Sequence, residues 1–204
     1  MNATIWDMET ESLNLSLTRP WQLAYVKLKN NKIVDRQNLY IDIHNLKVNP
    51  DAAKVTGFSW EIYNKKKLPA DHVVDIIQKD FIETDDLLVG HNILGYDIYI
   101  LMNLYNYVGR KLDFRDFIYR CIDTLCMARG RFFEVQLPAD ERERLSFMYK
   151  MLGRYDKAFK GKLIDVAKSF NIPVDEKKLH DALYDVTINA DVFKHLAYGT
   201  VLSK

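Results

Sequence analysis

Cysteine, excess charge of one sign and long apolar runs are all scarce in this chain of 204 residues. Its two cysteines, Cys121 and Cys126, are too few for a disulfide framework, and we expect both to stay reduced. A formal net charge of +1 gives no global field that would draw the protein onto nucleic acid, so such binding would depend on local patches. No apolar run approaches the length of a membrane span, and the first residues lack a basic-then-apolar signal pattern. We therefore expect a cytoplasmic protein without a membrane partner.

The first 43 residues are predicted to form a three-strand antiparallel meander. Residues 3–10 are largely apolar, and residues 21–28 and 33–43 alternate apolar and polar side chains. The Lys-Asn-Asn-Lys turn at residues 29–32 supplies a hairpin signal between the second and third strands. Further on, the basic run at residues 65–67 is interpreted as a solvated loop.

Beyond the meander, the apolar spacing becomes that of alternating helices and strands. The predicted elements are a short helix at 50–57, a helix at 70–84, a strand at 87–90, a helix from residue 95, a helix at 162–170 and a last helix from about 179 to 198. Residues 120–129 form either a strand or the start of a helix. The pattern predicts an α/β fold in which helices flank a mixed central sheet, and the length suits one domain spanning residues 1–204.

Two carboxylates end the first predicted strand. Side chains two residues apart on a strand share a face, so Asp7 and Glu9 are expected to lie side by side. Neighbouring carboxylates at a buried strand end repel each other and lose hydration, whereas a divalent cation such as Mg²⁺ removes both penalties. The alternative is that Glu9 lies beyond the strand and that both acids are simply solvated.

Further carboxylates follow in matching contexts. Asp97 is expected in the first turn of a helix, and Asp185 lies inside the last predicted helix, five residues after His180. Each has an ordinary alternative. Asn92 would cap a helix, and the helix dipole would favour Asp97. Asp185 would lie on the polar face of its helix, and His180 would be structural. Taken together, an acidic pair, an acid after His-Asn and a His-x₄-Asp spacing, in this order, favour an active site.

These motifs resemble those of the DEDDh branch of the DnaQ-like 3′–5′ exonucleases, which have a ribonuclease H-like fold. The matching residues are Asp7-Met8-Glu9-Thr10 for Asp-x-Glu-Thr, Gly90-His91-Asn92 and Tyr96-Asp97 for the second motif, and His180-Asp181-Ala182-Leu183-Tyr184-Asp185 for His-Asp-Ala-x-x-Asp. Residues 122–125 and 163–173 also look like family segments, so the resemblance covers nearly the whole chain. One departure is Glu11-Ser12, where many members carry Thr-Gly.

The resemblance implies a catalytic centre with two Mg²⁺ or Mn²⁺ ions that clamp the attacking and leaving oxygens. Asp7 is implied to bridge both ions, and Glu9 and Asp185 to complete the ion on the nucleophile side. Asp97 is implied to hold the second ion, partly through water. His180 is implied to be the general base, a role that suits an unperturbed pKa of about 6.5.

Substrate contacts are expected from residues of the first two motifs. Thr10 is expected to contact the terminal nucleotide through its backbone. Asn92 is assigned to substrate binding, and Tyr96 is expected to pack beneath the site rather than to react.

A second substrate-handling region is predicted at residues 129–162. This stretch carries nine basic and five acidic residues, a net charge of +4, and its aromatic residues are interleaved with those charges. Cations that pair with phosphates and rings that stack on bases suit single-stranded nucleic acid, so we interpret the stretch as an insertion in which Lys160 and Lys162 bind substrate. The alternative is that the rings pack helices onto the sheet.

We therefore predict a metal-dependent 3′–5′ exonuclease that releases nucleoside 5′-monophosphates from single-stranded DNA or RNA. The alternative enzyme is an exoribonuclease or an oligonucleotide-trimming nuclease, and the alternative outside enzymes is a non-catalytic nucleic-acid-binding or polymerase-associated module. Motif spacing does not choose between DNA and RNA, because recognition of the 2′-OH depends on side chains that spacing does not place. A polymerase or replication partner and the oligomeric state stay open.

Overall fold

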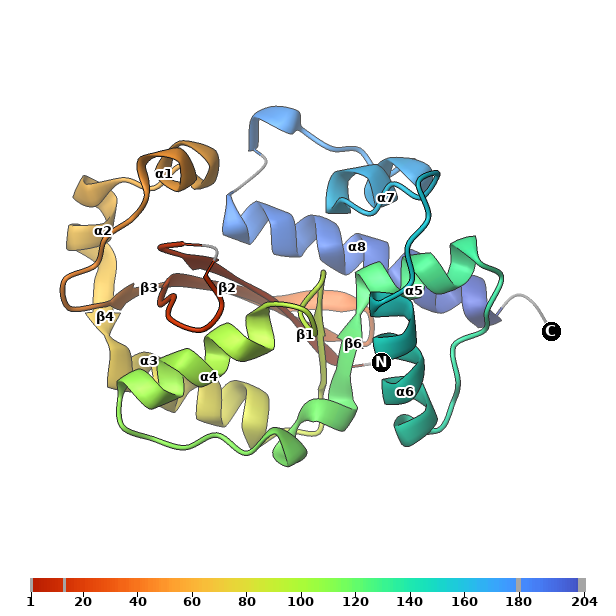
Figure 1. Ribbon diagram of the computed structural model, residues 1–204, viewed down its shortest axis with the longest axis horizontal. Coiled ribbons are helices and arrows are strands. Elements are labelled where there is room, and N and C mark those ends of the chain that lie inside the picture. The colour runs from red at the N-terminus through yellow and green to blue at the C-terminus, as the bar shows by residue number, and fades with distance from the viewer. Residues whose placement is uncertain (1, 13, 179–180, 202–204) are drawn as a thin grey trace.

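The computed structural model describes residues 2–12, 14–178 and 181–201, in which helices flank a six-stranded sheet (Figure 1). The strand order is β4-β3-β2-β1-β5-β6. The strands are β1 (Ala3–Thr10), β2 (Pro20–Lys29), β3 (Lys32–Asp42), β4 (Lys67–Pro69), β5 (Leu87–Gly90) and β6 (Cys121–Asp123). The predicted α/β class with a mixed central sheet is confirmed.

Strands β1, β2 and β3 form the predicted antiparallel meander. The hairpin between β2 and β3 turns at Asn30 and Asn31, whose φ values are 50° and 65°. Asparagine tolerates this left-handed conformation, which matches the twist of a two-residue hairpin. The meander places β1 at the centre of the sheet, where both of its edges have neighbouring strands.

Three short strands extend the meander in parallel. β5 pairs with the first half of β1, β6 pairs with β5, and β4 pairs with β3. The prediction of a solvated loop at residues 65–67 is wrong, because Lys65 and Lys66 end helix α2 and Lys67 opens β4. Lys67 pairs with Tyr40 in the sheet, and its ammonium nitrogen lies 2.9 Å from Oδ1 of Asp42.

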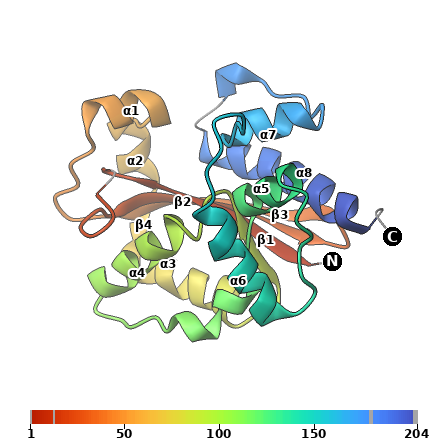
Figure 2. The ribbon, with the colours of Figure 1, turned by 45° about the vertical axis from the view of Figure 1, so that its right-hand side comes forward.

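Helices cover both faces of the sheet. The α-helices are α1 (Pro50–Thr56), α2 (Trp60–Lys66), α3 (Ala70–Ile77), α4 (Asp97–Tyr107), α5 (Thr124–Phe132), α6 (Glu141–Leu152), α7 (Leu163–Ser169) and α8 (Ala182–Val201). A π-helical turn at Gln78–Ile82 extends α3, and 3₁₀ turns lie at Phe114–Asp116, Ile118–Arg120 and Glu176–Lys178. Helices α3 and α4 lie on one face, and α8 lies on the other with α5 and α7 beside it (Figures 1 and 2). Among the described residues, no helix is long and apolar enough to cross a membrane.

Most predicted helices are confirmed with small changes at their ends. Asn49 caps α1 through its side chain, and Gly57 ends it in a left-handed conformation with φ of 65°. Both alternatives for residues 120–129 are present, since β6 leads directly into α5.

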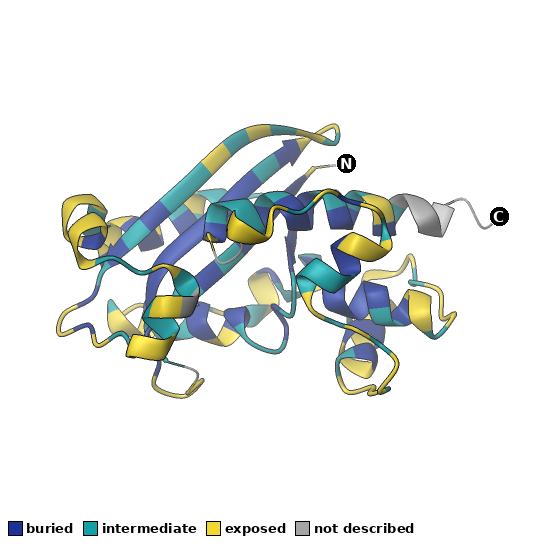
Figure 3. Cartoon of the chain, turned by 90° about the horizontal axis from the view of Figure 1, so that it is seen from above, coloured by how far each residue is buried: buried dark blue, intermediate teal, exposed yellow. Residues whose placement is uncertain are grey.

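The core lies between the sheet and its two helical layers. Figure 3 shows that the central strands are largely buried whereas many helices keep an exposed face. Trp6 of β1 is fully buried and meets Phe81 edge to face, with ring centroids 5.5 Å apart. Within this buried strand, Asp7 and Glu9 are the partly exposed positions.

Candidate active site

The second half of β1 has an open edge on the side of β5. The chain leaves the sheet after Gly90, so β5 pairs only with the first half of β1. A Cβ at residue 90 would lie 2.9 Å from the Trp6 carbonyl oxygen, so this close approach requires glycine. On the open edge, the Met8 N–H donates to Oδ1 of Asp97 over 3.1 Å. The Asp97 carboxylate therefore accepts a backbone hydrogen bond that a neighbouring strand would otherwise accept.

Asp7 and Glu9 share one face of β1, as strand periodicity predicts. Both side chains are partly buried, whereas Met8 between them is only 4% exposed. Because β1 runs to Thr10, the alternative that Glu9 lies beyond the strand is wrong.

Asp97 and Asp185 approach these acids from two helices. Asp97 is 3% exposed in the first turn of α4. Asp185 lies in the first turn of α8, where its N–H donates to the Asp181 carbonyl over 2.9 Å. A small cavity of about 150 Å³ is lined by Asp7, His91, Leu163, Asp185, Val186 and Asn189. The four predicted carboxylates therefore come from one strand and two helices.

The acids affect each other's protonation. Burial raises the pKa of Asp7 to about 7, and the charge of Asp185 adds to the shift. Burial, followed by the charges of Asp7 and Asp185, raises the pKa of Glu9 well above its usual range. Burial and then Asp7 raise the pKa of Asp97 in the same way, although the hydrogen bond from Met8 opposes the shift. The site is therefore short of positive charge.

This donor set fits a hard divalent cation. All four groups are carboxylates, which Mg²⁺ and Mn²⁺ prefer, and a cation would offset the repulsion and burial that raise their pKa values. Across residues 2–12, 14–178 and 181–201, no three His, Cys, Asp or Glu side chains already stand close enough to hold one ion. Metal binding would therefore draw the carboxylates together and release protons from them.

His180, the predicted general base, lies outside the described residues. The next residue, Asp181, accepts the Tyr184 N–H at Oδ1 over 3.0 Å at the start of α8. The chain therefore enters α8 close to Asp185, and the role of His180 stays a prediction.

Thr10 and Tyr96 form a hydrogen-bonded pair at the end of β1. The Tyr96 hydroxyl lies 2.8 Å from Oγ1 of Thr10 and donates to the Ser12 carbonyl over 3.1 Å. The Thr10 carbonyl accepts from Nε1 of Trp21 over 3.3 Å. These contacts orient the turn that follows the acids, and substrate contact through the Thr10 backbone or Tyr96 stays a prediction.

Glu11, which departs from the family pattern, holds the loop beside this turn. Its carboxylate accepts from Nε and Nη2 of Arg19 over 2.7 and 2.9 Å and from the Lys47 N–H over 3.1 Å. Arg19 also donates to the carbonyls of His44 and Asn45 over 2.8 and 3.1 Å. An ion pair therefore ties three loop segments together where many relatives are expected to have Thr-Gly.

Asn92 lies in the turn between β5 and α4, with a φ of 66°. Its N–H donates to Oδ1 of Asp123 over 3.0 Å, and the Leu94 N–H donates to Oδ2 over 3.1 Å. Asp123 is fully buried and also caps α5 by accepting the Leu125 N–H over 3.0 Å. Asn92 does not line the small cavity, and its contact with substrate stays a prediction.

Sequence patterns did not identify the roles of His91, Thr124 and Asn189. Nε2 of His91 donates to the Gly161 carbonyl over 2.8 Å, and Nδ1 lies 3.0 Å from Oγ1 of Thr124. Oγ1 of Thr124 donates to Oδ1 of Asn189 over 2.8 Å. The spacing of Asp185 and Asn189, four residues apart on a helix, was a usable signal that both face the same cavity.

The stretch 129–162 contains α6 and a loop that leads to α7. Lys160 and Lys162 are exposed on either side of Gly161 and do not line the small cavity. Phe147 is 7% exposed and packs in the core, as the packing alternative expects, whereas Tyr155 is 78% exposed and is available for contacts with substrate. That the stretch is an insertion and that its lysines bind substrate stay predictions.

Similar proteins have this fold. Escherichia coli exonuclease I in complex with a dT13 oligonucleotide superposes with a TM-score of 0.73 and 17% identity, over 96% of this chain and 40% of that one. The zinc-ion-bound form of the E. coli exonuclease I–ssDNA complex gives a TM-score of 0.75 and 16% identity, over 98% of this chain and 41% of that one. The predicted ribonuclease H-like fold is thereby confirmed.

Sequence comparison identifies the family. The RNase_T family model, described as Exonuclease, matches residues 4–129, which is more than half of the chain. The chain therefore belongs to this exonuclease family, and the DnaQ-like resemblance is confirmed. The family is metal-dependent. The match includes Asp7, Glu9 and Asp97 and ends before Asp185.

Two curated relatives are PolC-type DNA polymerases III. The protein from Listeria welshimeri is 25% identical over 192 residues, which cover 91% of this chain and 12% of the polymerase. The protein from Listeria innocua is 24% identical over 191 residues, with the same two shares. The chain thus spans about an eighth of the length of these relatives.

Proposed function

We propose that this exonuclease domain removes nucleoside 5′-monophosphates from the 3′ end of single-stranded DNA in a reaction that depends on two divalent metal ions. The observation that carries the proposal is that four carboxylates from β1, α4 and α8 lie near enough for their charges to act on one another, which together with burial raises the pKa values of Asp7, Glu9 and Asp97. DNA is favoured because the curated relatives are DNA polymerases and the similar exonuclease I structures contain DNA oligonucleotides.

Two ions bound at this site would neutralise charge on the scissile phosphate and activate the attacking water. Asp7 would contact both ions, Glu9 and Asp185 would complete the first, and Asp97 would hold the second. The hydrogen bond from the Met8 N–H to Oδ1 would help to orient the Asp97 carboxylate.

The surrounding residues would position the groups that react. A ring nitrogen of His180 would accept a proton from the attacking water as its oxygen bonds to phosphorus. The bond from phosphorus to the leaving O3′ would break, the shortened strand would keep a 3′-hydroxyl, and the released nucleotide would keep the phosphate. The hydrogen bonds of Tyr96 with Thr10 and Ser12 would hold the turn against which the terminal nucleotide rests.

The test is hydrolysis of 5′-labelled single-stranded DNA and RNA of equal sequence, with Mg²⁺, Mn²⁺ or EDTA. We expect a ladder that shortens from the 3′ end, faster on DNA and absent in EDTA. Asp7→Asn and Asp185→Asn should each slow it by roughly 100-fold or more, which corresponds to about 3 kcal/mol of barrier.

The matched control is Asp191→Asn, which removes an acid from the same helix as Asp185 and should leave the rate unchanged. Asp191 pairs with Lys194 over 2.9 Å and does not line the cavity. Internal cuts, or a ladder that persists in EDTA, would contradict the proposal. Binding without hydrolysis under every metal condition would favour a non-catalytic module. A ladder that forms faster on RNA would identify RNA, and not DNA, as the preferred substrate.

A further inference from the structure

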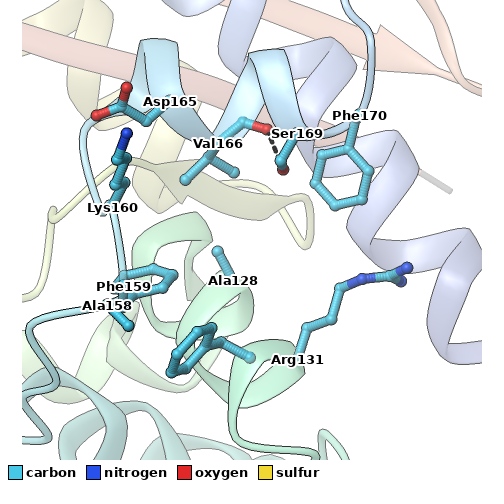
Figure 4. Close-up of a pocket in the computed structure, with 10 residues that line it drawn as sticks. Ala128, Arg131, Ala158, Phe159, Lys160, Asp165, Val166, Ser169 and Phe170 are labelled. Carbon is cyan, nitrogen blue, oxygen red and sulfur yellow. Dashed lines mark hydrogen bonds between the residues drawn. The ribbon is translucent and has the colours of Figure 1, made fainter.

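A second cavity of about 420 Å³ lies between α5 and α7, outside the carboxylate site. Its lining residues are Ala128, Arg131, Phe132, Ala158, Phe159, Lys160, Asp165, Val166, Ser169 and Phe170. Figure 4 shows Asp165, Val166 and Ser169 on one side and Ala128 and Arg131 on the other, with Phe159 and Phe170 at its margins. A cavity of this size can hold a small aromatic group.

The lining combines ring faces with cations. Phe132 is 43% exposed, and its ring centroid lies 5.4 Å from that of Phe159. The guanidinium of Arg131 lies 5.3 Å from the centroid of Phe170. Among the described residues, neither Arg131 nor Lys160 takes part in an ion pair. Both cations can therefore bind an anion.

Of the residues that the structure describes, Asp165 is the one acid that lines this cavity, against two cations. Figure 4 shows the Lys160 ammonium directed toward Asp165, on the side of the cavity opposite Arg131. The lining therefore has a net positive charge, with Arg131 at one end, Lys160 beside Asp165 at the other, and apolar ring surface between them. This distribution matches a base with a phosphate on each side, as in a nucleic-acid strand.

The second cavity shares a wall with the carboxylate site. Leu163 of α7 lines the small cavity with Asp7, whereas Val166 of the same helix lines the second cavity. The carbonyl of Gly161, next to Lys160, accepts from His91 of the small cavity over 2.8 Å. A strand with its 3′ end at the carboxylates can therefore reach the second cavity over this wall.

Gly161 packs closely against Leu125 of α5 and the Phe159 ring. A Cβ at this residue would lie 2.9 Å from Cδ1 of Leu125 and 2.9 Å from Cε1 of Phe159. A larger residue at this position would displace the ends of these two side chains.

We propose that the second cavity binds one base of the single strand upstream of its 3′ end, stacked on Phe132 and Phe159, with Arg131 and Lys160 on the flanking phosphates. This inference rests on the proposed function, because it takes its ligand from that reaction. The inference adds a substrate-binding subsite to the carboxylate site. This subsite is formed by α5, α7 and the loop before α7, and it contains no residue of the three sequence motifs.

The test is binding of a single-stranded DNA of about 12 nucleotides, measured by fluorescence anisotropy in EDTA so that no hydrolysis occurs. One base at a time is replaced by an abasic spacer. Loss of one particular upstream base should weaken wild-type binding about tenfold, the effect of losing one stacked base. In Phe132→Leu, the same spacer should have no effect.

Matched controls come from the same stretch of chain. Tyr155→Leu removes an exposed ring, and Lys157→Gln an exposed charge, that do not line the cavity. Lys160→Gln should weaken binding and lower its salt dependence more than Lys157→Gln does. The thermal midpoint of each variant shows whether the fold is kept, and Phe132 is exposed enough for leucine to be accommodated.

The two proposals fail in different ways. If the wild-type protein degrades the strand but no abasic position depends on Phe132, the cavity is not a base subsite. An acidic peptide that occupies the cavity without competing with DNA would also overturn it. If the wild-type protein degrades nothing under any metal condition, the proposed function is refuted, and the inference loses the reaction from which it takes its ligand.

Discussion

Replacing Asp7 with asparagine should stabilise the protein in the absence of metal, although it should abolish activity. The carboxylate is held on a buried strand, and burial together with Asp185 raises its pKa to about 7 from an ordinary value of 3.8. Asparagine keeps the shape of the side chain but carries no charge to be desolvated or repelled.

The direction follows from proton linkage. A carboxyl whose pKa is raised in the folded state binds its proton more tightly when folded, so its contribution to stability is fully present below pH 3.8 and is lost as pH rises through about 7. A pKa difference of about 3 corresponds to about 4 kcal/mol when fully expressed. Since solvent reaches Asp7 in part, we expect about 2 kcal/mol, or about 4–8 °C in the thermal midpoint.

The assay is thermal unfolding of wild-type and Asp7→Asn protein in EDTA, at about pH 5 and about pH 8. The variant should unfold at a higher temperature at the higher pH, and the difference should shrink at the lower pH, where Asp7 is protonated. Added Mn²⁺ should raise the midpoint of the wild type more than that of the variant, because the variant has lost a ligand.

Asp191→Asn serves as the control, since Asp191 is paired with Lys194 and should show no comparable gain. A variant less stable than the wild type at about pH 8, or a difference that does not change with pH, would refute the electrostatic reasoning.

Two loop contacts near the acids give further predictions. Glu11→Ala should lower stability by about 1–3 kcal/mol, because it leaves Arg19 and the Lys47 N–H without their acceptor. Burial alone would raise the pKa of Glu11, but the hydrogen bonds and charge of Arg19 lower it overall. The loss of stability in Glu11→Ala should therefore be present above the ordinary pKa of a glutamate and should fade in acid. Urea unfolding at several pH values measures it. Tyr96→Phe should cost about 1 kcal/mol through its lost bonds to Thr10 and Ser12 and should raise KM more than it lowers kcat; an unchanged KM would contradict a role for this turn in binding the 3′ end.

Local sequence patterns predict those parts of the fold in which the periodicity of the side chains matches their burial in the folded protein. The alternation along β1 places Asp7 and Glu9 on one face, and the Asn30-Asn31 turn sets the hairpin, because both depend on neighbours in sequence. Strand β4 was missed because three residues are too few to show a period and its first residue, Lys67, looks solvated.

Contacts between distant residues explain what local patterns missed in the site. His91 meets Thr124 across 33 positions and Gly161 across 70, and no spacing rule links these residues. Each of the four acids alone had an ordinary explanation; their joint order favoured an active site, and the resemblance to a family supplied their individual roles. The stretch 129–162 was singled out for its rings and cations, but spacing did not show that they form a cavity with residues of α7.

The wide separation of Asp7 and Asp185 along the chain affects when the protein becomes active. Asp7 belongs to β1 and leaves the ribosome before Asp185, which belongs to α8. Contacts of this length form only after the intervening chain has been ordered. A nascent chain would therefore lack a complete set of acids until α8 has been synthesised. Translation order would thus keep a nuclease harmless to nearby nucleic acid until its sheet is covered by α8.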